Sequence, residues 1–288
     1  MSQSLEQLLA EMRPKLHRYC ARMTGSTIDG EDVLQEAMIK AIEAHPRAGP
    51  IANPEGWLFR IAHNAALDHL RRRARQDALF ADEDPMAADP ADEVAARQAS
   101  AAALRTFMRL PVAQRSCVIL MDVLGHSLEE ISAVIDATIP AVKAALHRGR
   151  TRLRELAAEP DDNPLPVLGE PERSLLAAYV ERFNARDFDA IRTMLADEAR
   201  VEVVNRTRMN GRDEAGRYFT NASRGDDWRL VPGIVEGRPA TIVVDPSDPS
   251  ATPVHFSVLR FADGRLLEIR DFRYALYVLD GVDLRKTS

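Results

Sequence analysis

Two helix starts follow one another closely within residues 127–156, and this spacing constrains the fold more than any other feature of the sequence. Ser127 is a favourable N-cap residue, and Glu130, three positions later, completes a capping box. Thr138 offers a second N-cap, and Pro140 falls in the first turn after it, where a missing N–H costs little. Two helices joined by so short a turn are typical of a helix-turn-helix.

The second of these helices has an apolar face, which predicts the side chains that point outward. The inward positions recur at helical spacing: Val142, Leu146, Gly149 and Leu153. In a DNA-binding helix-turn-helix, the second helix reads bases with its N-terminal residues and holds the backbone with flanking cations. Lys143, His147 and Arg148 are therefore the candidate DNA-binding residues. Two roles stay open for the later arginines: they contact DNA phosphates, or they are solvated at a helix end where the helix dipole favours cations. These arginines are Arg150, Arg152 and Arg154.

Residues 1–75 predict three more helices. A turn region at 25–30 separates the first from the second, and a breaker-rich loop at 45–53 precedes the third, which is expected over 54–75. The second helix has one apolar face at helical spacing: Val33, Leu34, Ala37, Met38, Ala41 and Ile42.

Polar stripes remain on the other sides of these helices. The second helix carries Asp32, Gln35 and Glu36, and the third carries a mainly basic stripe: Arg60, Asn64, Arg71, Arg72 and Arg75. Guanidinium groups bind phosphates, and an amide such as that of Asn64 can hydrogen-bond base edges. Asp68 has two open roles, which are DNA contact and pairing with a neighbouring arginine.

The net charge of −6 argues against a nucleic-acid partner only until its distribution is considered. Residues 76–93 contain seven acidic and no basic residues, and they predict a linker. Residues 159–171 contain four prolines and predict a second linker. These linkers divide the chain into helical domains at 1–75 and 94–158 and a third domain at 172–288.

Cysteine usage and hydropathy exclude several other classes. Cys20 and Cys117 are too few and too far apart for a zinc signature or a disulfide framework. No apolar run approaches the roughly 20 residues that span a bilayer, and no leader-like segment opens the chain. We expect a cytoplasmic protein with no metal, no cofactor and no membrane contact.

The third domain has α+β texture, with a helix at about 172–196. Asp263-Gly264 is a hairpin signal between the last two of its expected strands. Those strands are predicted over these ranges: 200–205, 228–235, 239–245, 253–261 and 265–279.

Three segments, in this order, resemble the extracytoplasmic-function (ECF) group of RNA polymerase sigma factors: GEDVLQEAMIKAIEA, GWLFRIAHNAALDHLRRRAR and LPVAQRSCVILMDVLGHSLEEISAVIDATIPAVKAALHRGRTRLREL. The resemblance covers about the first 158 residues and includes the acidic linker. It implies a non-enzymatic protein whose partners are core RNA polymerase and promoter DNA. It also implies two all-α domains, sigma region 2 at 1–75 and the region 4 helix-turn-helix at 94–158.

The resemblance assigns a role to each polar stripe. It implies that Asp32, Gln35 and Glu36 dock on a coiled coil of the largest polymerase subunit. The stripe from Arg60 to Arg75 would capture and open the −10 element, with a flipped base selected by the loop at 45–53. Lys143, His147 and Arg148 would recognise the −35 element. The acidic linker would thread a polymerase channel or act as a solvated tether.

The segment AAYVERFNARDFDAIRTMLADEARVEVV, Ala177–Val204, resembles a SnoaL-like domain, an α+β cone. Some sigma factors use such an extension to regulate themselves in place of a separate anti-sigma protein. Val203–Gly216 departs from the glycine-rich stretch of the familiar version. Five residues are candidates for lining a pocket: Tyr179, Trp228, His255, Asp271 and Tyr274.

Three roles stay open for this domain. Intramolecular contact with the sigma domains is favoured, and small-molecule sensing and His–Asp proton transfer are the alternatives. For the whole chain, the competing hypotheses are a conventional helix-turn-helix regulator and a fused small-molecule isomerase or hydrolase. The first leaves residues 1–75 without a role, and no nucleophile elbow, P-loop or metal cluster in the sequence favours the second.

Overall fold

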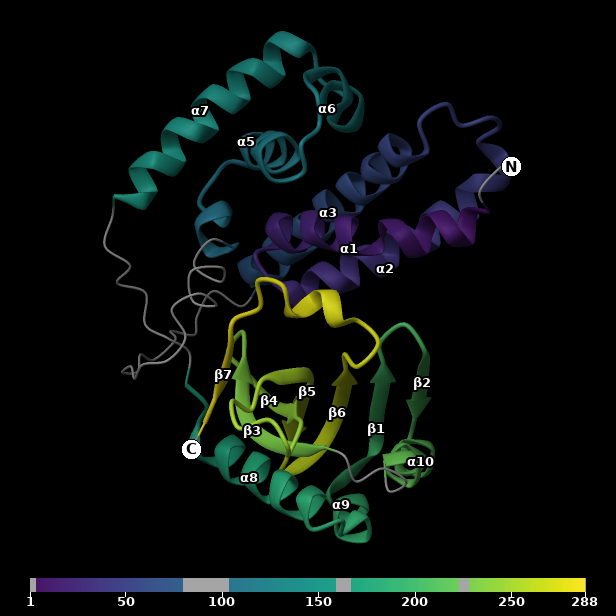
Figure 1. Ribbon diagram of the computed structural model, residues 1–288, viewed down its shortest axis with the longest axis vertical. Helices are drawn as coiled ribbons and strands as arrows, with labels where there is room; N and C mark the ends of the chain where they lie inside the picture. The colour runs from purple at the N-terminus through teal and green to yellow at the C-terminus, as the bar shows by residue number, and fades with distance from the viewer. Residues whose placement is uncertain (1–3, 80–103, 159–166, 223–227, 288) are drawn as a thin grey trace. The chain divides into compact units, whose positions relative to one another are not determined.

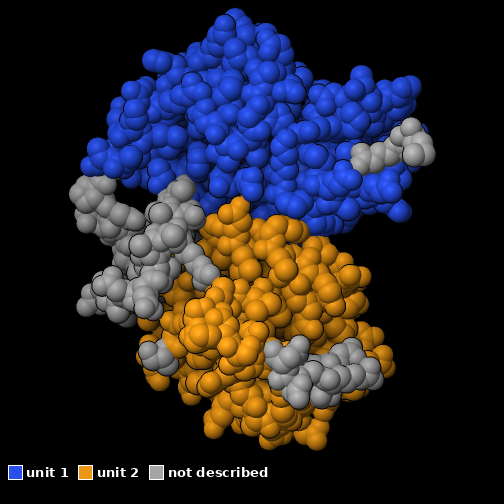
Figure 2. All heavy atoms as spheres, in the orientation of Figure 1, with its two compact units in different colours: residues 1–85, 99–163 blue, residues 86–98, 164–288 orange. Residues whose placement is uncertain are grey.

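The computed structural model describes residues 4–79, 104–158, 167–222 and 228–287. These residues form two compact units (Figure 2). The first unit contains residues 4–79 and 104–158, and the second contains residues 167–222 and 228–287. The first unit is helical and the second is α+β (Figure 1), as the sequence predicted. Most of the expected acidic linker, and residues 159–166 of the proline-rich one, lie outside the described residues.

The first unit opens with three helices: α1 (Leu5–Thr24), α2 (Thr27–Ala44) and α3 (Pro54–Leu79). Gly25 ends α1 in a left-handed conformation with φ of 77°, and Ser26 at once caps α2. The predicted turn region is therefore shorter than expected, and Gly30 lies inside α2. A Cβ at Gly30 would lie 2.6 Å from the backbone of Ala21, so glycine permits the close approach of α1 and α2.

The rest of the first unit includes α5 (Val112–Val118), the π-helical η2 (Ile119–Val123), α6 (Leu128–Ile135) and the longer α7 (Ile139–Ala157). Both predicted caps are confirmed. Ser127 and Glu130 form a reciprocal capping box at α6, and the Thr138 hydroxyl accepts from the N–H of Ala141 at α7. The turn between them is closed by Asp136 in the left-handed region.

The two helical parts of this unit pack on each other. The ring of His126, just before α6, meets the buried ring of Phe59 on α3 edge-on, with centroids 4.7 Å apart. Arg115 on α5 is 4% exposed and donates to the carbonyl oxygen of Met23 at 2.6 Å. It also donates to the carbonyls of Met108 and Leu110, each at 3.0 Å. A buried cation therefore links the end of α1 to the start of α5.

The second unit is a mixed sheet with helices on it (Figure 1). Strand order is β2-β1-β6-β5-β4-β3-β7, and only β1 and β6 pair in parallel among the neighbouring strands described. The helical elements are α8 (Glu170–Asn184), α9 (Phe188–Met194), α10 (Arg212–Ala222) and η3 (Leu276–Leu279). The strands are β1 (Leu195–Val203), β2 (Thr207–Asn210), β3 (Arg229–Val235), β4 (Arg238–Val244), β5 (Pro253–Ala262), β6 (Arg265–Asp271) and β7 (Leu284–Lys286).

Several predicted bounds in this unit need correction. The range 172–196, expected as one helix by its texture, contains two helices and the start of β1. The resemblance of Ala177–Val204 to a SnoaL-like domain implied this order of a helix, an Asp-Phe-Asp turn, a second helix and a strand. Asp187 caps the second helix by accepting from the N–H of Ala190. The strand expected over 265–279 ends at Asp271. The short strands β2 and β7 were missed, because neither has enough residues for an alternating pattern. The hairpin at Asp263-Gly264 is confirmed between β5 and β6.

The core of the second unit lies between the sheet and α8, α9 and α10. Aromatic rings dominate it, and Phe183 contacts both Phe188 and Phe219 edge-on. A Cβ at Gly233 would lie 2.5 Å from the carbonyl oxygen of Arg285, so glycine permits the pairing of β3 with β7.

Candidate nucleic-acid interface

The predicted docking stripe lies on one side of α2. Asp32 is exposed, whereas Gln35 and Glu36 are half-buried. Ile39 falls on the same stripe and is 57% exposed, a feature that sequence reasoning missed. Ile42 was predicted to point inward, but it is 55% exposed. It lies at the edge of the apolar face, roughly 110° around the helix from the centre of that face.

The basic stripe on α3 is exposed over its whole length. Arg60 and Asn64 are open to solvent, and Arg75 donates from Nε to the carbonyl oxygen of Arg71 at 3.2 Å. Asp68 accepts from Arg71 Nη1 at 3.3 Å, which is the pairing geometry considered from the sequence. The loop before α3 is exposed and contains one 3-10 turn, η1 (His45–Arg47).

Arg72 differs from the rest of the predicted −10 set. Its Nη2 lies 2.6 Å from Oε2 of Glu36 on α2, and the neighbouring Arg73 pairs with Asp29 at 3.3 Å. The hydrogen bond from Arg72 holds the pKa of the Glu36 carboxyl below its usual range, with further help from Lys40. Helical spacing alone could not reveal this contact, because it joins residues 36 positions apart.

On α7, the candidate residues Lys143, His147 and Arg148 are all exposed. Three of the four predicted inward residues, Val142, Leu146 and Gly149, are buried, whereas the fourth, Leu153, is half-buried.

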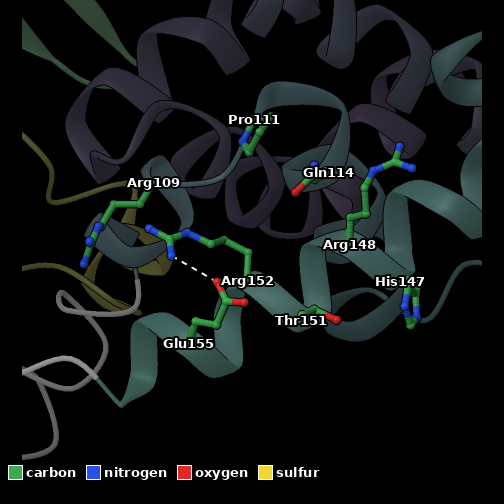
Figure 3. A pocket seen from close by; sticks show the side chains of 8 residues that line it. All are labelled: Arg109, Pro111, Gln114, His147, Arg148, Thr151, Arg152 and Glu155. Carbon is green, nitrogen blue, oxygen red and sulfur yellow. Dashed lines mark hydrogen bonds and ion pairs between the residues drawn. The ribbon is translucent and has the colours of Figure 1, made fainter.

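A hollow of about 450 Å³ opens beside α7, between it and residues 109–114 (Figure 3). His147 and Arg148 reach it from α7, and Arg109 faces it from the opposite wall. Arg152 also lines it and pairs with Glu155 at 3.0 Å. Its complete lining is Arg109, Pro111, Gln114, His147, Arg148, Thr151, Arg152 and Glu155.

This hollow has the chemistry of a phosphate contact. Its lining carries three guanidinium groups and one carboxylate, and Gln114 and Thr151 add neutral hydrogen-bonding groups. Arg109 and Gln114 were missed from the sequence, because they lie outside the helix-turn-helix that directed the search. Arg150, by contrast, is held by an ion pair with Asp122 and is less available for DNA.

The second unit contains a buried polar cluster around Asp271. Its carboxylate is fully buried and accepts from the Tyr218 hydroxyl at 2.8 Å and from Arg273 Nε at 2.6 Å. Burial raises the pKa of Tyr218 well above its ordinary value, and the negative charge of Asp271 adds to that rise. The sequence showed no sign of Tyr218 or Arg273, which come from α10 and from the residues after β6.

The predicted His255–Asp271 pair is close but not hydrogen-bonded, since Nε2 and Oδ1 are 3.7 Å apart. Burial lowers the pKa of His255, which favours the neutral ring. Tyr179 is buried near this carboxylate, whose charge raises its pKa in addition to the larger effect of burial.

The other two predicted pocket residues make separate contacts. Trp228 packs on Phe183, with centroids 4.9 Å apart, and under the guanidinium of Arg186 at 4.0 Å. Tyr274 is 51% exposed and stacks with Arg206 at 4.5 Å. The structure therefore brings only part of the predicted set together.

Among the described residues, no group of three or more His, Cys, Asp or Glu side chains is placed to hold a metal ion. In the same residues, no helix is long and apolar enough to cross a membrane.

Comparisons with known proteins match each part of the chain. The family models for Sigma-70 region 2, Sigma-70 region 4 and the SnoaL-like domain match residues 8–76, 100–153 and 176–269. The first two cover the exposed basic stripes on α3 and α7, and the third covers most of the second unit.

Two sigma factors agree with these family matches. The ECF RNA polymerase sigma factor SigM of Mycobacterium tuberculosis is 37% identical over 158 residues, which are 53% of this chain and 76% of SigM. SigG of the same organism is 27% identical over 90% of this chain and 78% of its own length. The crystal structure of M. tuberculosis SigJ covers 93% of this chain and 95% of its own, at 18% identity and a TM-score of 0.39. This chain belongs to the extracytoplasmic-function RNA polymerase sigma factors.

Proposed function

We propose that this sigma factor docks on core RNA polymerase through the α2 stripe, opens the −10 element with α3 and recognises the −35 element with α7. The sigma-factor function in transcription initiation follows from the family, and the residue roles are our assignment. The observation that carries it is the exposure of two basic helical stripes, on α3 and α7, over buried apolar faces. We assign region 2 to residues 1–75 and region 4 to 94–158, in a cytoplasmic protein.

Base reading and phosphate contact fall to different residues in this proposal. Asn64 offers an amide beside Arg60 for the bases of the opened −10 element. Lys143 lies in the first turns of α7, where a recognition helix reads the major groove. The hollow beside α7 adds Arg109 and Arg148 as holders of the DNA backbone.

The second unit, assigned here to residues 172–288, is proposed to regulate initiation by the same chain. Buried Asp271 already has tyrosine and arginine partners, which favours a structural role over proton transfer. A non-enzymatic regulatory role agrees with this arrangement.

Transcription in vitro with core polymerase and a promoter library tests the proposal. Full-length protein should initiate from a defined promoter class. Lys143→Ala should weaken −35 recognition, and Asn64→Ala should impair opening on the same templates. Absence of core binding by the full-length protein would refute the sigma-factor assignment, and normal transcription by both variants would refute the residue roles.

Removal of residues 160–288 tests the second unit separately. We expect transcription from the selected promoters to change substantially, and unchanged transcription would argue against regulation by this unit. Turnover of a small molecule by the full chain would instead favour the enzyme alternative for the second unit.

A further inference from the structure

Glu36 and Arg72 belong to surfaces with different assigned partners, yet they form one ion pair. Glu36 lies on the docking side of α2, and Arg72 belongs to the basic part of α3. Arg72 Nη2 lies 2.6 Å from Glu36 Oε2, and Lys40 Nζ lies 2.8 Å from Oε1 of the same carboxylate.

The pair is part of a larger group, here named the α2–α3 ion-pair network: Glu36, Lys40, Asp68, Arg71 and Arg72. Lys40 Nζ also lies 3.5 Å from Asp68 Oδ2, and Asp68 Oδ1 lies 3.3 Å from Arg71 Nη1. The network therefore runs without interruption from the docking stripe to the DNA stripe.

The three cations of this network are largely, but not fully, neutralised by its two carboxylates. The Glu36 side chain is 29% exposed, and its low pKa keeps it ionised and bound to its cations at neutral pH. Arg73, the next cation along α3, also faces a carboxylate, that of Asp29 at 3.3 Å. A phosphate that approaches this part of α3 therefore meets arginines whose charge is already partly neutralised.

We propose that Glu36 masks Arg72 in the free chain, and that a partner bound to the docking side of α2 releases Arg72 to bind single-stranded DNA. The inference rests on the proposed function and gives Glu36 a second role within it. Because coupling between two binding sites is reciprocal, DNA held by Arg72 also strengthens docking.

The chemistry of the partner follows from this competition. To displace Arg72, the partner must present its own cation to the Glu36 carboxylate. Asp32 and Glu43, which are exposed on the same side of α2, favour a basic partner surface for the same reason. Ile39 lies between these acids and supplies an apolar centre for the contact.

The test uses the full chain without polymerase and a fluorescent oligo-dT single strand at low salt. Glu36→Gln should bind the strand about two- to five-fold more tightly, the range set by one exposed ion pair. It should also steepen the dependence of log affinity on log salt by about 0.7, the value for one more phosphate contact on a single strand. Glu43→Gln is the matched control, because it removes the same charge from the same side of α2.

A double variant isolates the mechanism. In an Arg72→Gln background, Glu36→Gln should bring no further gain, since the masked cation is absent. Three results would each overturn the proposal. Glu43→Gln could tighten binding to the strand as much as Glu36→Gln does, Glu36→Gln could leave that binding unchanged, or its gain in affinity could persist without Arg72. Normal binding of Glu36→Gln to core polymerase would refute the docking assignment, so the two failures are distinguishable.

Discussion

The packing of α6 against α3 predicts that the first unit must open before both promoter elements are bound. Phe59 on α3 and His126 before α6 are in direct ring contact, and Asn64 and Lys143 are the assigned base readers on either side. From Asn64 to Lys143 through this contact, the chain spans no more than roughly 55 Å, even if every segment pointed the same way.

The promoter requires a longer reach. The −10 and −35 elements are named by their positions, which places them about 25 base pairs apart. At 3.4 Å per base pair, this separation is roughly 85 Å of duplex. Extended arginine or lysine side chains do not close this gap. The contact between α3 and α6 must therefore break during promoter binding, whereas the docking stripe on α2 is accessible without that change.

A cross-link between α3 and α6 tests this reasoning directly. Glu55 and Glu130 are 41% and 45% exposed, and Lys15 forms an ion pair with Glu55. Hydrogen bonds with Ser127 are the main cause that lowers the pKa of Glu130, and the charge of Lys15 adds to it, so both carboxylates lie near Lys15. Cysteines at these two positions can be joined by a short, cleavable bis-maleimide. The native Cys20 and Cys117 are buried, so they are protected from the reagent.

We expect the cross-linked protein to bind core polymerase normally but to lose transcription by about ten-fold or more, since the open form is excluded. Cleavage of the cross-link should restore transcription. The single-cysteine variants treated with the same reagent, and the double variant treated with a monofunctional maleimide, are the controls. Full transcription by the cross-linked protein would refute the reach argument.

Three further predictions concern stability, each measured by unfolding of the full chain. Arg115→Met should lose about 3–5 kcal/mol, because two buried carbonyls and one part-buried carbonyl lose a charged donor; a loss below 1 kcal/mol would contradict the linking role. Burial lowers the pKa of His63 to about 4, from the ordinary value of 6.5 that it has in the unfolded chain. Between pH 6.5 and pH 4 the unfolded state therefore binds more protons than the folded state. Stability should fall by about 2 kcal/mol from pH 7 to pH 5, and His63→Gln, titrated in urea over the same range, should show a smaller fall. Gly30→Ala should cost about 1–3 kcal/mol through its clash with α1, whereas Gly216→Ala, whose new Cβ would have 3.7 Å of room, should be neutral or stabilising.

Local sequence signals predicted the helix-turn-helix because its determinants are local. A capping box needs two side chains three residues apart, and Ser127 and Glu130 provide them without help from the rest of the fold. The same holds for Asp263-Gly264, where two residues with positive φ are enough to close a hairpin. The exposed faces of α3 and α7 also followed from helical spacing, since the opposite faces are buried.

The features that were missed depend on contacts between distant segments. Tyr218 and Asp271 are 53 positions apart, and nothing in the spacing of either strand or helix joins them. Arg109 reaches the hollow beside α7 from outside the predicted motif. Ile42 was wrongly predicted to be buried. The apolar repeat along α2 shows which side of the helix is apolar, but not how much of that side the neighbouring helices cover.

Arg72 illustrates what this difference means for function. Sequence alone gives an arginine its charge and its place in a stripe, but the availability of that charge depends on the carboxylate opposite it. Among the described residues, no carboxylate forms an ion pair with Arg60, whereas Arg72 and Lys40 both pair with Glu36. Two arginines that are equivalent by composition should therefore contribute to DNA binding at different stages. On this reasoning Arg60 binds DNA whenever α3 is accessible, and Arg72 does so only after α2 has bound its partner.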